Sequence, residues 1–275
     1  CNPTICSRDG IDNPDITLQG WSARGEGGLR LQEYFGNGAW AEQMRVPTEN
    51  AVPIAVTDGM SAAKWLGLGS MLVPYGGFLA ADLRPGETVL VSGATGNFGS
   101  CAVAVAIAMG AGCVIATGRN PEALEALQQR FGKRVRTVPM RGDETDDRAR
   151  MIAASPGPID CVFDILPPMA TATQVRTALM AVKPYGRIVL MGGVGMLGGD
   201  DLSLPYPWIM RNCITIHGVW MYPPHAVSSL IRLVQSGLLS LEHFENTVFG
   251  LDQVNEAVVH AAHHAMPFQQ TVIVP

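Results

Sequence analysis

The sequence has few charged residues, and the charges it has are more often acidic than basic. Asp, Glu, Lys and Arg make up 16% of the 275 residues, and 19 basic side chains against 24 acidic ones give a net charge of −5. Nucleic acids and anionic membrane surfaces are bound through clusters of Lys and Arg, which this chain lacks. We therefore expect no nucleic acid and no membrane as partners. A hydrophobic content of 47% excludes a disordered chain and suffices for a sizeable core.

Cysteine is also scarce. Six cysteines in a chain of this length are too few for a disulfide framework. Four of them lie inside apolar runs and are typical of buried free thiols: Cys101, Cys113, Cys161 and Cys213. Residues 2–10 are polar and rich in turn formers, which is unlike a signal peptide. These features predict a cytoplasmic protein.

One long segment, 88–118, contains no charged residue and has the hydropathy of a membrane span. Two glycine-rich breaks interrupt it, at 92–97 and at 110–112. A helix in lipid is not expected to carry two such breaks. We therefore predict a buried strand, a turn, a buried helix and a second buried strand.

The rest of the chain alternates between short β-branched runs and helical patterns. Strands are predicted over 39–47, 50–54, 88–91, 113–117, 135–138, 159–164, 187–192, 213–218, 247–249 and 270–274. Helices are predicted over 61–68, 71–81, 100–109, 121–131, 143–154, 173–182, 226–236 and 252–264, the last with Asp252 as its N-cap. This alternation predicts an α/β fold with a doubly wound parallel sheet of the Rossmann type.

A glycine motif stands between the first predicted strand of the sheet and the helix after it. Glycines at this position allow a tight turn and a close approach of a pyrophosphate to the backbone, while the helix N-terminus supplies amide donors. The cofactor-binding residues predicted here are Gly93, Thr95, Gly96, Asn97, Phe98 and Gly99. The alternative is a purely structural glycine-rich turn.

The end of the second strand indicates which dinucleotide is bound. An NAD site places Asp or Glu about 20 residues after the glycines, where it binds the ribose hydroxyls. Here the strand ends in Gly118, Arg119 and Asn120, and the next carboxylate is Glu122. Gly118 leaves room and Arg119 offers a planar cation for a 2′-phosphate. We predict NADP(H), with a solvated surface role for Arg119 as the alternative.

Several segments together resemble a known family. They are Gly38–Glu42 with Val46-Pro47, Leu83–Val91, Gly93–Gly99, Asp160–Asp164, Lys183–Val189 and Leu251–Ala257. In this order they are similar to the medium-chain dehydrogenases/reductases, on the zinc-independent side that resembles quinone oxidoreductases, with zinc-type alcohol dehydrogenases as the related branch. The resemblance covers nearly the whole chain from about residue 38.

The resemblance implies a Rossmann domain combined with a GroES-like β-barrel. It divides the chain into a partial GroES-like catalytic domain over 1–58, a Rossmann NADP-binding domain over 59–237 and a C-terminal return to the catalytic domain over 238–275. The family's barrel starts well before Cys1, and the first residue is not Met. We therefore expect a fragment or processed form that lacks the N-terminal part of the catalytic domain.

Two further loops follow predicted strands at the edge of the sheet where ligands bind. In the family, such loops line the ribose and nicotinamide of the cofactor. The resemblance therefore adds Ile165, Leu166, Pro167, Gly192, Gly193 and Val194 to the cofactor site. The alternative is that both are ordinary strand-to-helix loops.

We expect no metal site. The family's structural zinc uses four closely spaced cysteines, whereas the opening segment here has only Cys1 and Cys6. The alignment places one catalytic-zinc cysteine of the family near 69–70, where Gly and Ser cannot serve as that ligand. The adjacent pair His263 and His264 is typical of a solvated helix end.

Without zinc, an alcohol or ketone lacks its Lewis acid, which favours a quinone, an enone or a related carbonyl compound as the hydride acceptor. Tyr75, Trp208 and Tyr222 are candidate substrate-pocket residues, with core or dimer packing as the alternative. No catalytic proton donor is identified. The apolar segment 213–218 matches a strand that in the family pairs across a two-fold axis, so a homodimer is expected.

Two other functions remain open at this point. One is an alcohol dehydrogenase whose zinc ligands lie in the N-terminal part absent here. The other is a protein that binds NADPH without catalysis, as a redox sensor or a structural partner. A small-molecule substrate is expected for either enzyme.

Overall fold

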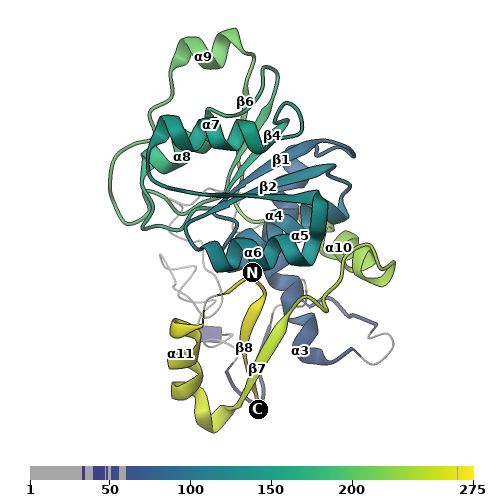
Figure 1. The fold of residues 1–275 in the computed structure, drawn as a ribbon. Coiled ribbons are helices and arrows are strands. Elements are labelled where there is room, and N and C mark those ends of the chain that lie inside the picture. The colour runs from purple at the N-terminus through teal and green to yellow at the C-terminus, as the bar shows by residue number, and fades with distance from the viewer. Residues whose placement is uncertain (1–32, 35–39, 47, 49–50, 56–59, 265) are drawn as a thin grey trace.

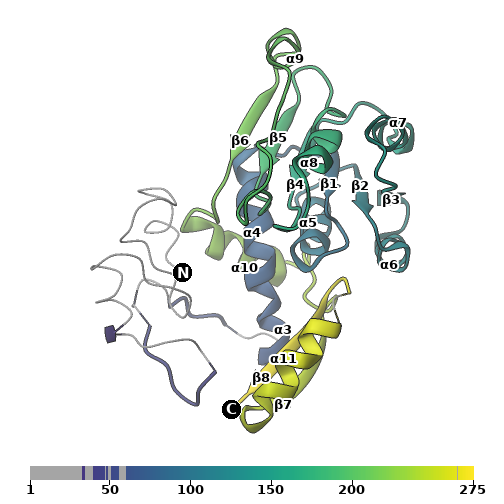
Figure 2. The same cartoon turned by 90° about the vertical axis from the view of Figure 1, so that its left-hand side faces the viewer.

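In the computed structural model, the chain is described at residues 33–34, 40–46, 48, 51–55, 60–264 and 266–275. The main feature is a parallel sheet of six strands in the order β3-β2-β1-β4-β5-β6. Figure 2 shows the six strands side by side in this order. The strands are β1 (Thr88–Ser92), β2 (Cys113–Gly118), β3 (Val135–Pro139), β4 (Cys161–Asp164), β5 (Arg187–Leu190) and β6 (Thr215–Gly218). The predicted doubly wound Rossmann sheet is confirmed.

Helices cover both faces of this sheet, as Figure 1 shows. The helices that connect its strands are α5 (Asn97–Ala108), α6 (Pro121–Phe131), α7 (Glu144–Ala154), α8 (Ala172–Leu179) and α9 (Tyr206–Arg211). Side chains of α5 and α6 pack on one face, and those of α7 and α8 pack on the other. The charge-free segment 88–118 forms β1, α5 and β2, as predicted. No helix in the described part of the chain is both long and apolar enough to cross a membrane.

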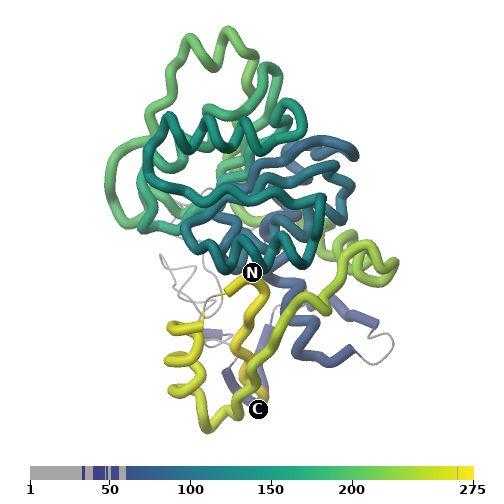
Figure 3. Tube along the Cα trace, in the orientation of Figure 1, coloured from purple at the N-terminus to yellow at the C-terminus, as the bar shows by residue number. Residues whose placement is uncertain are grey.

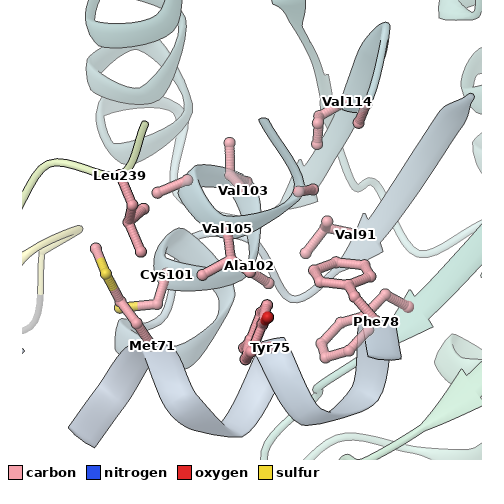
Figure 4. Close-up of a cluster of buried hydrophobic side chains, with 14 of the residues drawn as sticks. Met71, Tyr75, Phe78, Val91, Cys101, Ala102, Val103, Val105, Val114 and Leu239 are labelled. Atoms are coloured by element: carbon pink, nitrogen blue, oxygen red, sulfur yellow. The ribbon is translucent and has the colours of Figure 1, made fainter. Parts of the chain in front are cut away.

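The larger core lies between the sheet and the helices α4 (Gly67–Ala80) and α5, as Figure 4 shows. Met71, Tyr75 and Phe78 point from α4 toward α5 and the sheet. The rings of Phe78 and Phe163 lie in contact, with centroids 4.5 Å apart, and both side chains are fully buried. This contact ties α4 to β4 at the middle of the sheet. The short helix α3 (Ala62–Trp65) precedes α4.

A second, smaller unit follows helix α10 (His225–Gln235), and the tube in Figure 3 shows how the chain enters it. Its two parallel strands, β7 (Glu245–Gly250) and β8 (Gln269–Val274), are joined through α11 (Val254–His263). The short 3₁₀ helix 251–253 contains Asp252, and Gln253 is the N-cap of α11. The prediction of Asp252 as the N-cap of this helix is therefore wrong.

The structure agrees less well with the elements predicted near the N-terminus than with the predicted sheet. In the predicted strand 39–47, the described residues 40–46 form no strand, and all of them are exposed. The described residues 51–55 also have no strand. Most of the predicted partial barrel, 1–58, lies outside the described residues, and the division into three domains stays a prediction. Helix α9 is absent from the predictions, since Pro205 and Pro207 suggest a loop there.

Phe78→Ala is expected to lower the free energy of unfolding by about 3–5 kcal/mol, because it empties part of the core between α4 and β4. Urea denaturation followed by circular dichroism measures the change. Met169→Ala is the matched control, since Met169 is 72% exposed and its loss is expected to cost less than about 0.5 kcal/mol. Equal effects of the two substitutions would contradict this description of the core.

Candidate functional site

The carboxyl end of β1 leads into a turn that glycine makes possible. Gly93 has a φ of +90°, a conformation that other residues rarely adopt. A Cβ on Gly99 would lie 2.0 Å from the carbonyl oxygen of Gly93. The first turn of α5 therefore packs directly on the turn that precedes it. The glycine motif is placed where the sequence predicted, between strand and helix.

The N-terminus of α5 is open to a ligand. Its N-cap is Gly96, so no side chain caps the helix, and the first amides keep their hydrogen-bonding capacity. The side chain of Asn97 donates a hydrogen bond to Ser70 Oγ at 3.1 Å, on the neighbouring helix α4. Phe98 is 43% exposed. The uncapped amides and the positive end of the helix dipole fit a phosphate group.

The end of β2 is held against this turn. The amide of Ala94 donates a hydrogen bond to the carbonyl oxygen of Thr117 at 2.9 Å. A Cβ on Gly118 would lie 2.4 Å from Thr95 Cγ2, so the Thr95 side chain occupies the space that a larger residue would fill. A larger residue at position 118 would therefore require the Thr95 side chain to move.

The two residues after Gly118 have different roles. Asn120 Oδ1 accepts hydrogen bonds from the amides of Glu122 and Ala123 and so caps α6. Its side chain is engaged in the fold. Arg119 is exposed and, within the described part of the chain, forms no hydrogen bond or ion pair. Its guanidinium is therefore available to a ligand at the edge of the sheet.

The loops after β4 and β5 lie beside each other at the same edge. The amide of Gly193 donates a hydrogen bond to the carbonyl oxygen of Leu166 at 2.9 Å. A Cβ on Gly193 would lie 2.7 Å from Pro168 Cγ, and a Cβ on Gly93 would lie 3.2 Å from the Ile165 carbonyl oxygen. The glycine turn and the loops 165–167 and 192–194 are thus brought together. Pro167 is exposed and Val194 is half-buried.

A buried carboxyl group stands at the base of these loops. Asp164, the last residue of β4, is 2% exposed, and its Oδ1 has no hydrogen-bond partner among the described residues. Burial raises the pKa of Asp164 to about 7, and hydrogen bonds from the Ser92 side chain and the Leu166 backbone oppose this rise. Sequence reasoning used Asp164 only as part of a family pattern. The available signal was a single acid at the end of an apolar strand.

The three aromatic residues predicted for a substrate pocket do not form one cluster. Tyr75 lies in the core between α4 and α5, where it is 7% exposed. Tyr222 packs on the same side of the sheet, and a Cβ on Gly76 of α4 would lie 2.5 Å from its Cβ. Trp208, on α9, packs with the cluster on the opposite face. Burial raises the pKa of the Tyr222 hydroxyl.

No group of three or more His, Cys, Asp or Glu side chains suited to a metal occurs in the described residues. Cys1 and Cys6 lie outside them, so the expectation of no zinc stays a prediction. His264 stacks on His260, with ring centroids 4.0 Å apart, at the end of α11. They line a polar cavity of about 130 Å³ between α11 and the pair β7–β8. This cavity is lined by none of the predicted site residues.

Comparison with known proteins gives a consistent assignment. A family model described as "Zinc-binding dehydrogenase" matches residues 98–236, about half of the chain. Sorbitol dehydrogenase of Bacillus subtilis (strain 168) is 26% identical over 179 residues, which cover 65% of this chain and 48% of that protein. Quinone oxidoreductase-like protein 2 of Rattus norvegicus is 27% identical over 202 residues, covering 68% and 54%. The chain spans about half the length of these curated relatives.

A solved structure shows the same fold. Acetophenone reductase from Geotrichum candidum NBRC 4597, solved in complex with NAD, superposes with a TM-score of 0.61 at 24% identity. The match covers 81% of this chain and 58% of that one. At this identity the likeness supports the Rossmann-like architecture and leaves the chemistry to the site itself.

Gly99→Ala is expected to destabilise the chain by roughly 1–3 kcal/mol, since its Cβ cannot fit against the Gly93 carbonyl without a backbone shift. Gly96→Ala is the matched control from the same turn. A Cβ there would lie 3.7 Å from the Gly93 carbonyl oxygen, and the change is expected to cost about 1 kcal/mol or less. Thermal unfolding of both variants measures the difference. A Gly96→Ala variant less stable than Gly99→Ala would refute the close packing described here.

Proposed function

Because the chain belongs to the zinc-binding dehydrogenase family, within the medium-chain dehydrogenases/reductases, we propose that it is an NADPH-dependent oxidoreductase. It transfers a hydride to a quinone, an enone or a related carbonyl substrate without catalytic zinc. The observation that carries the proposal is the uncapped N-terminus of α5 at a glycine turn, next to the unengaged guanidinium of Arg119. The family as a whole consists of oxidoreductases that bind a nicotinamide cofactor.

The amides at the start of α5 would hold the pyrophosphate of the cofactor. Gly93 and Gly99 support this role, because a Cβ at either position would meet neighbouring backbone, the Ile165 carbonyl at 3.2 Å and the Gly93 carbonyl at 2.0 Å, so that glycine allows the turn to pack this tightly. Gly96, Thr95 and the exposed Phe98 border the same turn. Asn97, bonded to Ser70, fixes the first residue of the helix to α4. The residues present therefore fit a dinucleotide phosphate.

Arg119 supports NADPH over NADH. The strand ends in Gly118 and has no acid that could bind an NAD ribose before Glu122. A guanidinium beside it pairs well with a 2′-phosphate, which carries nearly two negative charges at neutral pH. Asn120 contributes indirectly, because its side chain caps the N-terminus of α6 beside Arg119.

The loops 165–167 and 192–194 would border the nicotinamide end of the cofactor. The hydrogen bond between Gly193 and Leu166 keeps these loops side by side. When bound, NADPH supplies the hydride, and an electron-poor carbon of the substrate accepts it. The chain's own part is to bind, to orient and to exclude water. The loops and the half-buried Tyr222 are the candidates for this work, whereas Trp208 packs with the cluster on the opposite face of the sheet.

Zinc has no evident place among the described residues, which contain no cluster of three potential ligands. A substrate that is already electron-poor needs no Lewis acid for hydride transfer, which supports quinones and enones over simple alcohols. Metal analysis of the purified protein tests this part of the proposal.

The compartment proposed is the cytoplasm. Cys101, Cys113, Cys161 and Cys213 are free thiols, and the first three are buried. Burial raises the pKa of Cys161 to about 12, so its thiol stays protonated. Free cysteines in this number are typical of a reducing environment.

Fluorescence titration with NADPH and with NADH tests the cofactor assignment. We expect NADPH to bind more tightly, and Arg119→Ala to weaken NADPH by about 10- to 100-fold while leaving NADH nearly unchanged, because one charge-assisted contact is lost. Lys133→Ala, which removes another exposed cation, is the control and should change neither affinity. Preference for NADH would refute the role of Arg119. NADPH binding without reduction of any quinone or enone would favour a non-catalytic binding protein.

A homodimer is proposed through the edge strand β6. In the described sheet β6 pairs only with β5, so one side of its backbone is unpaired. The adjacent α9 exposes Tyr206 and Met210, which add apolar surface at the same edge. A second copy pairing strand to strand would cover both.

Size-exclusion chromatography with light scattering is expected to give the dimer mass. The amide of Thr215 donates to the Gly186 carbonyl on the β5 side, so the amide of Ile216 faces the free edge. Ile216→Pro removes that outward donor and is expected to yield monomers with an unchanged far-UV spectrum. A wild-type monomer at all concentrations would contradict the proposed interface.

A further inference from the structure

The buried carboxyl of Asp164 is unusual in its position. It ends the central strand β4 at the carboxyl edge of the sheet, after three apolar or weakly polar residues of the same strand. It is 2% exposed, and Oδ1 lacks a partner among the described residues. A buried acid with an unsatisfied oxygen is costly when ionised and much less costly when neutral. Such a group calls for an explanation beyond packing.

The carboxyl lies against the backbone of the loop after its own strand, β4, and of the loop after the neighbouring strand β5. A Cβ on Gly192 would lie 2.6 Å from Asp164 Oδ2 and 2.8 Å from the Leu166 carbonyl oxygen. The carboxyl therefore occupies the space that a side chain at 192 would take. The same two loops are joined by the hydrogen bond from Gly193 to Leu166. The carboxyl is therefore packed at the point where the two loops meet.

No charged side chain accounts for the protonation behaviour of this group. The effects on its pKa are burial, which raises it, and hydrogen bonds from Ser92 and from the Leu166 backbone, which lower it. On the strands beside it, the charged groups Glu87, Asp160 and Arg187 stand at the opposite, amino end of the sheet.

The helices packed nearby add no unpaired charge. On α8, which packs on β4, Arg176 is paired with Glu144. On α4, Tyr75 lies in the core. The glycine turn and the two loops contain no titratable side chain. The pKa of the Asp164 carboxyl is thus determined by its burial and by the loops around it.

We propose that Asp164 is a positioning residue whose neutral carboxylic acid holds the loops after β4 and β5 in the arrangement that accepts the dinucleotide, so that loss of its proton loosens the loops and weakens cofactor binding. The inference rests on the proposed function, since it concerns the same site. An ionised carboxylate there must draw in water or displace the backbone of Leu166 and Gly192. An incoming dinucleotide is itself anionic and further favours the neutral acid.

The sign of the pH dependence follows from linkage. The acid is neutral below about pH 7 and ionised above it. If only the neutral form binds, the NADPH dissociation constant is expected to rise about twentyfold from about pH 6.5 to about pH 8.5, by one-proton linkage. Asp164→Asn keeps the shape of the neutral acid and cannot ionise. Its affinity is expected to match that of the wild type at low pH and to stay flat.

Two further variants distinguish the effect of Asp164 ionisation on NADPH affinity from a general effect of pH. Asp160→Asn removes a carboxylate at the amino end of the sheet, where Asp160 binds the Thr88 amide at 2.8 Å, and should keep the wild-type pH profile. Ser92→Ala removes a hydrogen bond that favours the ionised form, so it should move the midpoint of the profile to higher pH. If Asp164→Asn fails to fold, the Ser92→Ala variant still tests the proposal. An Asp164→Asn profile as steep as the wild type's, or a Ser92→Ala midpoint that does not rise, would overturn the proposal.

Amide hydrogen exchange gives a readout that needs no cofactor. The Gly193 amide, bonded to Leu166, is expected to exchange faster in the wild type above about pH 7 than its intrinsic rate predicts, and not in Asp164→Asn. If no dinucleotide binds at any pH, the proposed function and the effect on affinity both fail. The exchange result then decides whether Asp164 holds the loops. Protection that is the same in both proteins at every pH would overturn that part as well.

Discussion

The structure depends on glycines at the carboxyl edge of the large sheet, where the absence of a side chain allows close packing. At Gly99, Gly118 and Gly192, a Cβ would lie 2.0, 2.4 and 2.6 Å from the Gly93 carbonyl, the Thr95 side chain and the Asp164 carboxyl. The contact at Gly99 holds the first turn of α5 against the turn before it, while those at Gly118 and Gly192 hold the ends of neighbouring strands together. The conformation of the glycine turn and the burial of the Asp164 carboxyl both result from this packing.

The charged side chains at the amino ends of β4 and β5 are paired, whereas, within the described chain, Arg119 and Asp164, at the carboxyl ends of β2 and β4, are not. At the amino edge, acids and bases are paired, as in Glu87 with Arg187 and Asp160 with Lys183. At the carboxyl edge, Arg119 forms no pair within the described chain and Asp164 is buried without a countercharge. Paired charges hold strands together, whereas unpaired ones remain responsive to a ligand or to a proton.

Local patterns predicted most of the sheet, and long-range contacts account for what was missed. The segment 121–131 carries Pro at its first turn and a polar face, and it forms α6 with those bounds. The predicted strand 39–47 has no partner strand among the described residues, and sequence alternation alone does not supply one. The glycine turn is encoded locally and was predictable. The burial of Asp164 depends on Gly192, far along the chain, which no local pattern reveals.

The strand order has a consequence for synthesis on the ribosome. Among the six strands, β1 emerges first and ends in the interior of the sheet, with β2 and β3 added outward on one side and β4, β5 and β6 on the other. Every new strand joins an existing edge, and none has to be inserted between two strands already paired. The nascent chain can therefore gain structure step by step as it is translated. Until β4 arrives, the unpaired side of β1 is the surface that a chaperone would be expected to shield.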